Sequence, residues 1–196
     1  MKLLLASGSP RRADVLRRAG FLFDTMETRV DETRAPGEGP ETFVQRLAIA
    51  KAQAAADDLL DTSGPTLIIG ADTTVVAGGA LLEKPTDAKD ARRMLRLLSG
   101  KTHEVLTGVA LMALPDGRGA KFVDRTRVDF AELSERQIDD YIATGESFGK
   151  AGGYAIQGFA GRFVERIEGC YFNVMGMPLS RVWTAMLSLG WKDPEA

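Results

Sequence analysis

The stretch Thr66–Ala71 constrains the fold most, because it is an unbroken run of apolar and β-branched residues. Such a run is typical of a strand that is covered on both faces. Asp72 follows it directly, so we expect this carboxylate at the carboxyl end of the strand. A second apolar run, Lys2–Ala6, is followed by turn residues and then by helical spacing. The two runs together predict an α/β fold in which helices cover a central sheet.

The rest of the chain continues this alternation of helix and strand patterns. Apolar residues at helical spacing predict helices over 11–19, 41–60, 87–98 with Thr86 as N-cap, 134–145 and 178–189. Strand patterns cover 21–23, 104–114, 121–130 and 162–167, and residues 75–82 form a hairpin pattern around two glycines. Residues 31–40 and 149–154 are expected to be loops, the first exposed and mobile. We therefore predict a mixed central β-sheet flanked by helices, in a single domain over residues 1–196.

Composition narrows the classes of partner. The 196 residues are 44% apolar and 27% charged, which is ordinary for a globular chain, and the net charge of −2 does not favour nucleic acid. The single cysteine leaves no internal disulfide and fits a reducing compartment. The apolar start is too short for a signal peptide, and no apolar run has a membrane-spanning length. We expect a cytoplasmic protein that binds neither nucleic acid nor a membrane.

Ser7–Arg12 is the first candidate site, because it joins a predicted strand to a predicted helix. Ser9 can cap the helix, Pro10 fits its first position, and Arg11 and Arg12 add positive charge. The unpaired amides of a first helical turn bind phosphate well. The same residues fit an ordinary capped helix with solvated arginines about equally well.

Two acidic positions form the second candidate. Asp72 follows a buried strand, where a carboxylate can bind a divalent ion or accept a proton from water. Glu32 lies in the polar loop 31–40 and, if it is near Asp72 in space, completes a magnesium site of oxygen ligands. The alternatives are that Asp72 caps a turn with Thr73 and Thr74, and that Glu32 is only solvated.

Further polar residues are weaker candidates on their own. Lys51 and Lys84 can neutralise a polyphosphate, although a lysine such as Lys51 on a helix more often extends to solvent. Gln157 ends a glycine-rich segment and offers a donor and acceptors to a base edge, whereas the alternative is a flexible connector. His103, the single histidine, and Cys170 are expected to be structural.

The order of these motifs resembles one family, Maf, which is described as a septum-formation inhibitor and as a nucleoside triphosphate pyrophosphatase. The resemblance covers nearly the whole chain and rests on residues 6–12, 30–32, 48–52, 70–73, 84–85, 99–103, 107–109 and 149–158. Small departures are Thr74, where valine or isoleucine is usual, and Glu83, where many members have glycine. These departures bear only on the local shape beside Lys84.

The resemblance implies a fold related to the inosine triphosphate pyrophosphatases, bilobed with a central nucleotide cleft, a divalent metal (magnesium or manganese) and often a homodimer. It makes Asp72 and Glu32 both catalytic residues and metal ligands. The substrate-binding residues that it implies are Ser7, Ser9, Arg11, Arg12, Lys51, Thr73, Lys84 and Gln157. Arg12, Thr73 and Gln157 match the subgroup that acts on dTTP and UTP. The sister subgroup, which prefers 7-methyl-GTP, lacks the Gly-Gly-Tyr-Ala-Ile-Gln arrangement and is the second choice of substrate.

A different class of function uses the same phosphate loop. A nucleotide-binding regulator of cell division would dock to a protein partner and would not need hydrolysis. Such a protein has little use for Asp72 and Glu32 beside a triphosphate, because carboxylates repel phosphates unless a metal lies between them. The acidic pair therefore favours the enzyme. A third reading, an α/β domain without catalysis, treats all the motifs as coincidence.

Overall fold

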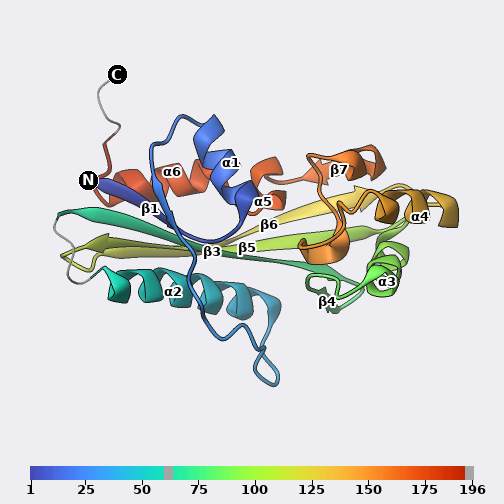
Figure 1. The fold of residues 1–196 in the computed structure, drawn as a ribbon, viewed down its shortest axis with the longest axis horizontal. Helices are drawn as coiled ribbons and strands as arrows, with labels where there is room; N and C mark the ends of the chain where they lie inside the picture. Colours follow the sequence, from blue (N-terminus) through green and yellow to red (C-terminus); the bar gives the residue numbers. More distant parts are fainter. Residues whose placement is uncertain (60–63, 193–196) are drawn as a thin grey trace. The chain divides into compact units, whose positions relative to one another are not determined.

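The protein is described by a computed structural model that covers residues 1–59 and 64–192. Within these residues, seven strands form one mixed sheet in the order β2-β1-β3-β5-β6-β7, with β4 paired to β3 (Figure 1). The chain divides into two compact units. Unit 1 takes the described residues of Met1–Asp72, Thr107–Asp124 and Gly176–Ala196, and unit 2 takes Thr73–Leu106 and Arg125–Met175.

Unit 1 contains two short strands and three helices: β1 (Lys2–Ala6), α1 (Pro10–Arg18), β2 (Asp24–Met26), α2 (Pro40–Asp58) and α6 (Leu179–Ser188). Unit 2 contains β4 (Ala80–Leu82), α3 (Ala88–Leu98), α4 (Glu135–Ala143), the 3₁₀ helices η1 (Ala151–Gly153) and η2 (Phe159–Phe163), β7 (Val164–Glu168) and α5 (Tyr171–Val174). Three long strands contribute residues to both units: β3 (Thr66–Ala77), β5 (Thr102–Leu114) and β6 (Gly119–Phe130).

Strand β1 organises unit 1, because it pairs in parallel with both β2 and β3. Helix α2 covers one face of these strands, and α1 and α6 cover the other (Figure 1). Two glycines let α2 approach the sheet closely. A Cβ atom at Gly70 would lie 2.2 Å from the carbonyl oxygen of Ala48, and one at Gly108 would lie 2.3 Å from that of Val44. The backbone of α2 therefore packs directly on β3 and β5.

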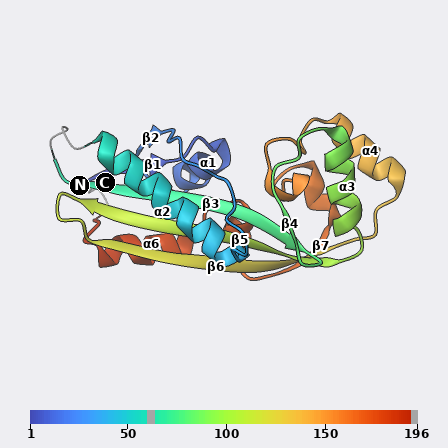
Figure 2. The same ribbon diagram turned by 90° about the horizontal axis from the view of Figure 1, so that it is seen from below.

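Unit 2 has a core of its own. Helices α3 and α4 lie side by side (Figure 2). Their buried apolar residues pack with those of β3, β5 and β6 and with the segments that follow α4. Aromatic rings stack edge to face in this core, among them Phe130, Tyr154 and Phe163. The segment before η2 therefore packs on this core through the ring of Tyr154.

The structure confirms the mixed sheet flanked by helices. The predicted capping box of α4 is present, with Ser134 and Gln137 each bonded to the other's backbone. The end that we expected for α2, Leu60, lies outside the described residues. The expected single domain and the likeness to inosine triphosphate pyrophosphatases remain predictions. No helix in the described residues combines the length and apolar character that a membrane span needs.

Three sequence expectations were wrong in detail. The second strand is Asp24–Met26, not 21–23, because Phe21 packs on Trp183 and the strand register pairs Leu4 with Asp24. The N-cap of α3 is Asp87, not Thr86, since the Asp87 carboxylate accepts the amide hydrogen of Asp90 at 2.7 Å.

The predicted position of Asp72 was also wrong, because the residue lies within β3 and not at its end. Strand β3 continues to Ala77, and its last residues pair with β4 in the predicted hairpin. The neighbouring strand β1 does end here, because Ala6, its last residue, pairs with Gly70. Asp72 therefore extends beyond the end of β1, beside the loop that begins at Ser7.

Candidate active site

Glu32, Lys51 and Asp72 form a compact cluster in unit 1. The ammonium nitrogen of Lys51 lies 2.7 Å from Oε1 of Glu32 and 2.7 Å from Oδ1 of Asp72. The side chains of Lys51 and Asp72 are only 10% and 13% exposed, whereas that of Glu32 is 51% exposed. Two carboxylates thus converge on one cation, with one side of the cluster open to solvent. We call these three residues the carboxylate–lysine cluster.

Close packing of α2 on β3 explains why Lys51 reaches Asp72. Gly70 admits the backbone of α2 at Ala48, and Lys51 follows one helical turn later. Asp72 lies two residues beyond Gly70 along β3, on the same side of the strand. The sequence favoured a solvent-exposed Lys51, but the structure buries it in an ion pair.

Arg12 is buried beside the loop after β1. Its Nε donates to the carbonyl oxygen of Gly176 at 3.0 Å, and one terminal nitrogen donates to the hydroxyl of Ser7 at 3.0 Å. Burial lowers the pKa of the Arg12 guanidinium, and the negative charges of Asp72 and Glu32 oppose this shift. An arginine remains protonated even so. The structure therefore holds a positive charge in a defined orientation near the carboxylate–lysine cluster.

The other residues of the first motif are also placed in unit 1. Pro10 begins α1 as predicted, and Ser9 is the N-cap residue, although its side chain makes no capping hydrogen bond. The amide of Ser9 instead donates to the hydroxyl of Ser7 at 3.2 Å. Arg11 lies on the first turn of α1 and is half-buried. The expected loop between β1 and α1 is thus present, with Ser7 as its internal hydrogen-bond acceptor, and its binding of phosphate remains a prediction.

Arg46 holds the loop that carries Glu32, a role that no sequence pattern predicted. Its guanidinium donates to the carbonyl oxygen of Thr33, the residue after Glu32, at 3.0 Å. It also donates to the carboxylate of Glu38 at 2.7 Å, and this bond lowers the pKa of Glu38 to about 2. The loop 31–40 is exposed, as expected, but it is tied to α2 by these contacts.

Unit 2 carries the remaining candidates, Lys84 and Gln157, and both are exposed. The segments on which they lie are joined, because the amide of Gly152 donates to the carbonyl oxygen of Glu83 at 3.1 Å. Gly152 has φ of +71°, and a Cβ atom there would lie 2.9 Å from Val75. Thr73 follows Asp72 in β3 and begins unit 2 in the chain.

His103 contacts the glycine-rich segment, residues 149–158, through Tyr154. Its Nε2 lies 2.8 Å from the hydroxyl of Tyr154, and its ring packs edge to face on Phe130. Burial lowers the pKa of His103 to about 4, although the negative charge of Asp129 opposes the shift. A neutral, buried histidine of this kind is structural, as the sequence indicated.

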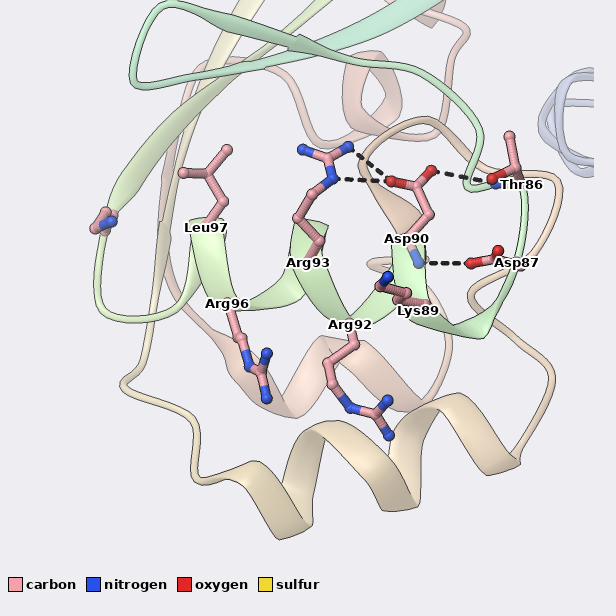
Figure 3. Close-up of a pocket in the computed structure, with 9 residues that line it drawn as sticks. Thr86, Asp87, Lys89, Asp90, Arg92, Arg93, Arg96 and Leu97 are labelled. Atoms are coloured by element: carbon pink, nitrogen blue, oxygen red, sulfur yellow. Dashed lines mark hydrogen bonds and ion pairs between the residues drawn. The ribbon is translucent and has the colours of Figure 1, made fainter.

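A basic hollow of about 640 Å³ lies along α3 in unit 2 (Figure 3). Its arginines already contact carboxylates: Arg93 pairs with Asp90 at 2.8 Å, Arg96 with Glu135 at 2.7 Å, and Arg92 with Asp139. The charges of these three arginines are therefore largely compensated, and Lys89 and Lys101 also line the hollow.

The carboxylate–lysine cluster fits a divalent ion of the magnesium class. In the described ranges, 1–59 and 64–192, no group of three or more His, Cys, Asp or Glu side chains could hold a metal by itself. Magnesium, however, is usually bound by only one or two carboxylates together with water and substrate phosphates. Glu32 and Asp72 supply two such carboxylates that already converge on a cation.

A family model covers nearly the whole chain. The Maf profile, described as Maf-like protein, matches residues 2–189. The chain belongs to the Maf family. The match includes every residue of the carboxylate–lysine cluster, the loop Ser7–Arg12 and Gln157.

Relatives from distant bacteria carry one description. A Koribacter versatilis protein described as a dTTP/UTP pyrophosphatase is 48% identical over 192 residues, 97% of this chain and 95% of its own. A Geobacillus protein of the same description is 48% identical, covering 97% and 99%. One from Hahella chejuensis is 45% identical, covering 98% and 96%. A solved structure from Mycobacterium abscessus, described as a nucleoside-triphosphatase / dITP/XTP pyrophosphatase, matches only weakly, with 19% identity, a TM-score of 0.36 and coverage of 68% and 76%.

Proposed function

We infer that this protein is a nucleotide pyrophosphatase that converts dTTP and UTP into the monophosphate and pyrophosphate. The carboxylate–lysine cluster is the observation that carries this inference, together with Maf membership and the descriptions of its relatives. The cluster holds two carboxylates and a buried lysine beside a buried arginine. That combination suits the attack of water on a phosphate anhydride.

Asp72 is the proposed catalytic base. It is mostly buried and held at 2.7 Å by Lys51, so its carboxylate has a fixed direction. A fixed carboxylate orients a water molecule and accepts its proton as the water attacks the α-phosphorus. The bond between the α- and β-phosphates breaks, and the electron pair leaves with pyrophosphate. Glu32 is the second carboxylate and lies on the open side of the cluster.

Positive side chains stabilise the charge on the phosphates. Arg12 is oriented by Ser7 and Gly176, and Arg11, Ser9 and Lys84 provide further contacts in this proposal. Lys51 neutralises the two carboxylates in the absence of substrate. It would contact the phosphates if a divalent cation held by Glu32 and Asp72 took over that neutralisation.

A magnesium or manganese ion, held by Glu32 and Asp72, would polarise the phosphate oxygens and screen the carboxylates from them. The residues of this chain then determine where substrate lies relative to the ion. Gln157, with Thr73, is proposed to read the base, because its amide offers both a donor and an acceptor to a pyrimidine edge. A homodimer and a cytoplasmic location belong to the same proposal.

The test is product analysis with purified protein, magnesium or manganese, and a panel of nucleotides that includes dTTP, UTP, CTP, the purine triphosphates and 7-methyl-GTP. We expect monophosphate and pyrophosphate from dTTP and UTP ahead of the others. Preference for 7-methyl-GTP would move the protein to the sister subgroup. Binding of nucleotides without cleavage of any would support the regulatory function instead.

A further inference from the structure

Glu146, a residue outside every motif considered so far, contacts the segment after Gln157 directly and the segment before it through Tyr141. Its Oε2 accepts the amide hydrogen of Phe159 at 3.0 Å, and its Oε1 accepts that of Ala160 at 3.3 Å. Phe159 and Ala160 directly follow Gly158, the neighbour of Gln157. One carboxylate therefore fixes the backbone on the C-terminal side of Gln157.

The N-terminal side is fixed through Tyr141. The hydroxyl of this fully buried side chain donates to Oε1 of Glu146 at 3.0 Å and accepts the amide hydrogen of Ala155 at 3.2 Å. Glu146 and Tyr141 together thus hold the backbone two residues before Gln157 and two residues after it. The side chain of Gln157 itself stays exposed between these anchors.

Gly158 shows how close this contact is. A Cβ atom at position 158 would lie 2.0 Å from Oε2 of Glu146 and 2.5 Å from its carboxyl carbon. Real Cβ atoms do not come this near, so only glycine fits next to Gln157 while the carboxylate is in place. The sequence pattern Gln157-Gly158 therefore belongs with Glu146, twelve residues upstream of Gly158.

We propose that Glu146 is a positioning residue that sets base selectivity by fixing the backbone from which the Gln157 side chain reaches the base. This inference rests on the base-reading role given to Gln157 under the proposed function. The side-chain amide of Gln157 offers a donor and an acceptor, and hydrogen bonds to a base edge form only within narrow limits of distance and angle. A fixed backbone sets the distance and angle at which this amide meets the base, and so contributes to discrimination between bases.

The experiment compares kcat/KM for dTTP and UTP with that for CTP and the purine triphosphates in Glu146→Ala, Gln157→Ala and the double variant. Glu146→Ala should lower the selectivity ratio about threefold or more, in the range of one lost hydrogen bond. In the Gln157→Ala background it should change the ratio no further, because the two residues act through one contact. Glu146→Gln keeps one accepting oxygen but turns an NH2 group toward another donor, so it should restore the selectivity only in part. Glu135→Ala, a glutamate of the same unit that pairs with Arg96, is the matched control.

Several results would overturn the proposal. Equal loss of activity on all bases would make Glu146 merely structural, as would an undiminished effect of Glu146→Ala in the Gln157→Ala background. If Gln157→Ala itself leaves selectivity unchanged, the base-reading role fails, and this inference fails with it. If Gln157→Ala changes selectivity but Glu146→Ala does not, only this inference fails. If Glu146→Ala does not fold, Tyr141→Phe takes its place. This variant keeps the buried ring and removes the bridging hydroxyl, and the same results would support or overturn the proposal.

Discussion

The two units place their candidate side chains in opposite ways. In unit 1 most of the candidate groups are buried and bonded to each other, as in the pair Lys51 and Asp72 and in Arg12 with Ser7. In unit 2 the candidate side chains Lys84 and Gln157 are exposed, and Tyr141 and Glu146 hold the backbone on either side of Gln157. Fixed charges suit chemistry on phosphate, whereas an exposed amide on a fixed backbone suits recognition of a base. Variants in the two units should therefore fail differently.

The largest effect is expected from Asp72→Asn in unit 1. The variant keeps the shape of the side chain and removes the base, so kcat for dTTP should fall roughly 10³-fold while the protein stays folded. Steady-state release of pyrophosphate measures this loss. Asp57→Asn, an exposed position on α2, is the matched control and should retain full activity. Near-normal turnover by Asp72→Asn would remove the catalytic role from the cluster.

Unit 2 should show a pH-dependent stability that comes from His103. Its folded pKa of about 4 lies below the usual 6.5, so the unfolded chain binds the proton more readily. The resulting stability is complete above pH 6.5 and is lost as the pH falls toward 4, by about 3 kcal/mol from the shift in pKa. Urea unfolding at both pH values should show this loss in the wild type and a smaller one in His103→Gln. Parallel curves would contradict a neutral, buried histidine.

Arg12→Lys tests whether orientation matters in unit 1 as much as charge. Lysine keeps the charge but cannot donate to Ser7 and Gly176 in the same fixed geometry. We expect kcat/KM for dTTP to fall about 10- to 100-fold, as for a lost charge-assisted contact. Arg18→Lys, an exposed arginine on the same helix that pairs with Asp14, should have no effect. Equal behaviour of the two variants would mean that Arg12 contributes charge alone.

Gln157→Ala should give the smallest effect, in unit 2. We expect KM for dTTP and UTP to rise about 3- to 10-fold, the range of one hydrogen bond, and KM for purine nucleotides to rise less. Initial rates over a range of each nucleotide measure the difference. Gln53→Ala, an exposed glutamine on α2, is the control. A uniform rise across all bases would assign the base-reading role elsewhere.

Local patterns predicted most of the elements but fewer of their contacts. The apolar runs and helical spacings identified the strands and helices because they depend on neighbours in sequence. The pattern failed at Asp72, since the end of β3 is set by pairing with β4 and not by its own residues. It also favoured a solvated Lys51, because nothing in the sequence shows that Gly70 admits the backbone of α2.

The residues that support the site could not be predicted from the sequence, for the same reason. Arg46 and Glu146 contact backbone atoms of other segments, and Gly176 offers its own carbonyl oxygen to the side chain of Arg12. Such contacts leave no spacing rule in one sequence, because any residue supplies a backbone carbonyl or amide. Only the three-dimensional packing shows which long side chains reach them. By contrast, the family motifs marked every residue of the carboxylate–lysine cluster in advance.

The most direct test of the central claim is to identify the phosphorus atom that water attacks. A single turnover of dTTP in ¹⁸O-labelled water, followed by mass analysis of both products, identifies the phosphorus that receives the new oxygen. Attack at the α-phosphorus, as proposed for water held by Asp72, predicts labelled dTMP and unlabelled pyrophosphate. Label in pyrophosphate, or release of inorganic phosphate and dTDP, would contradict it.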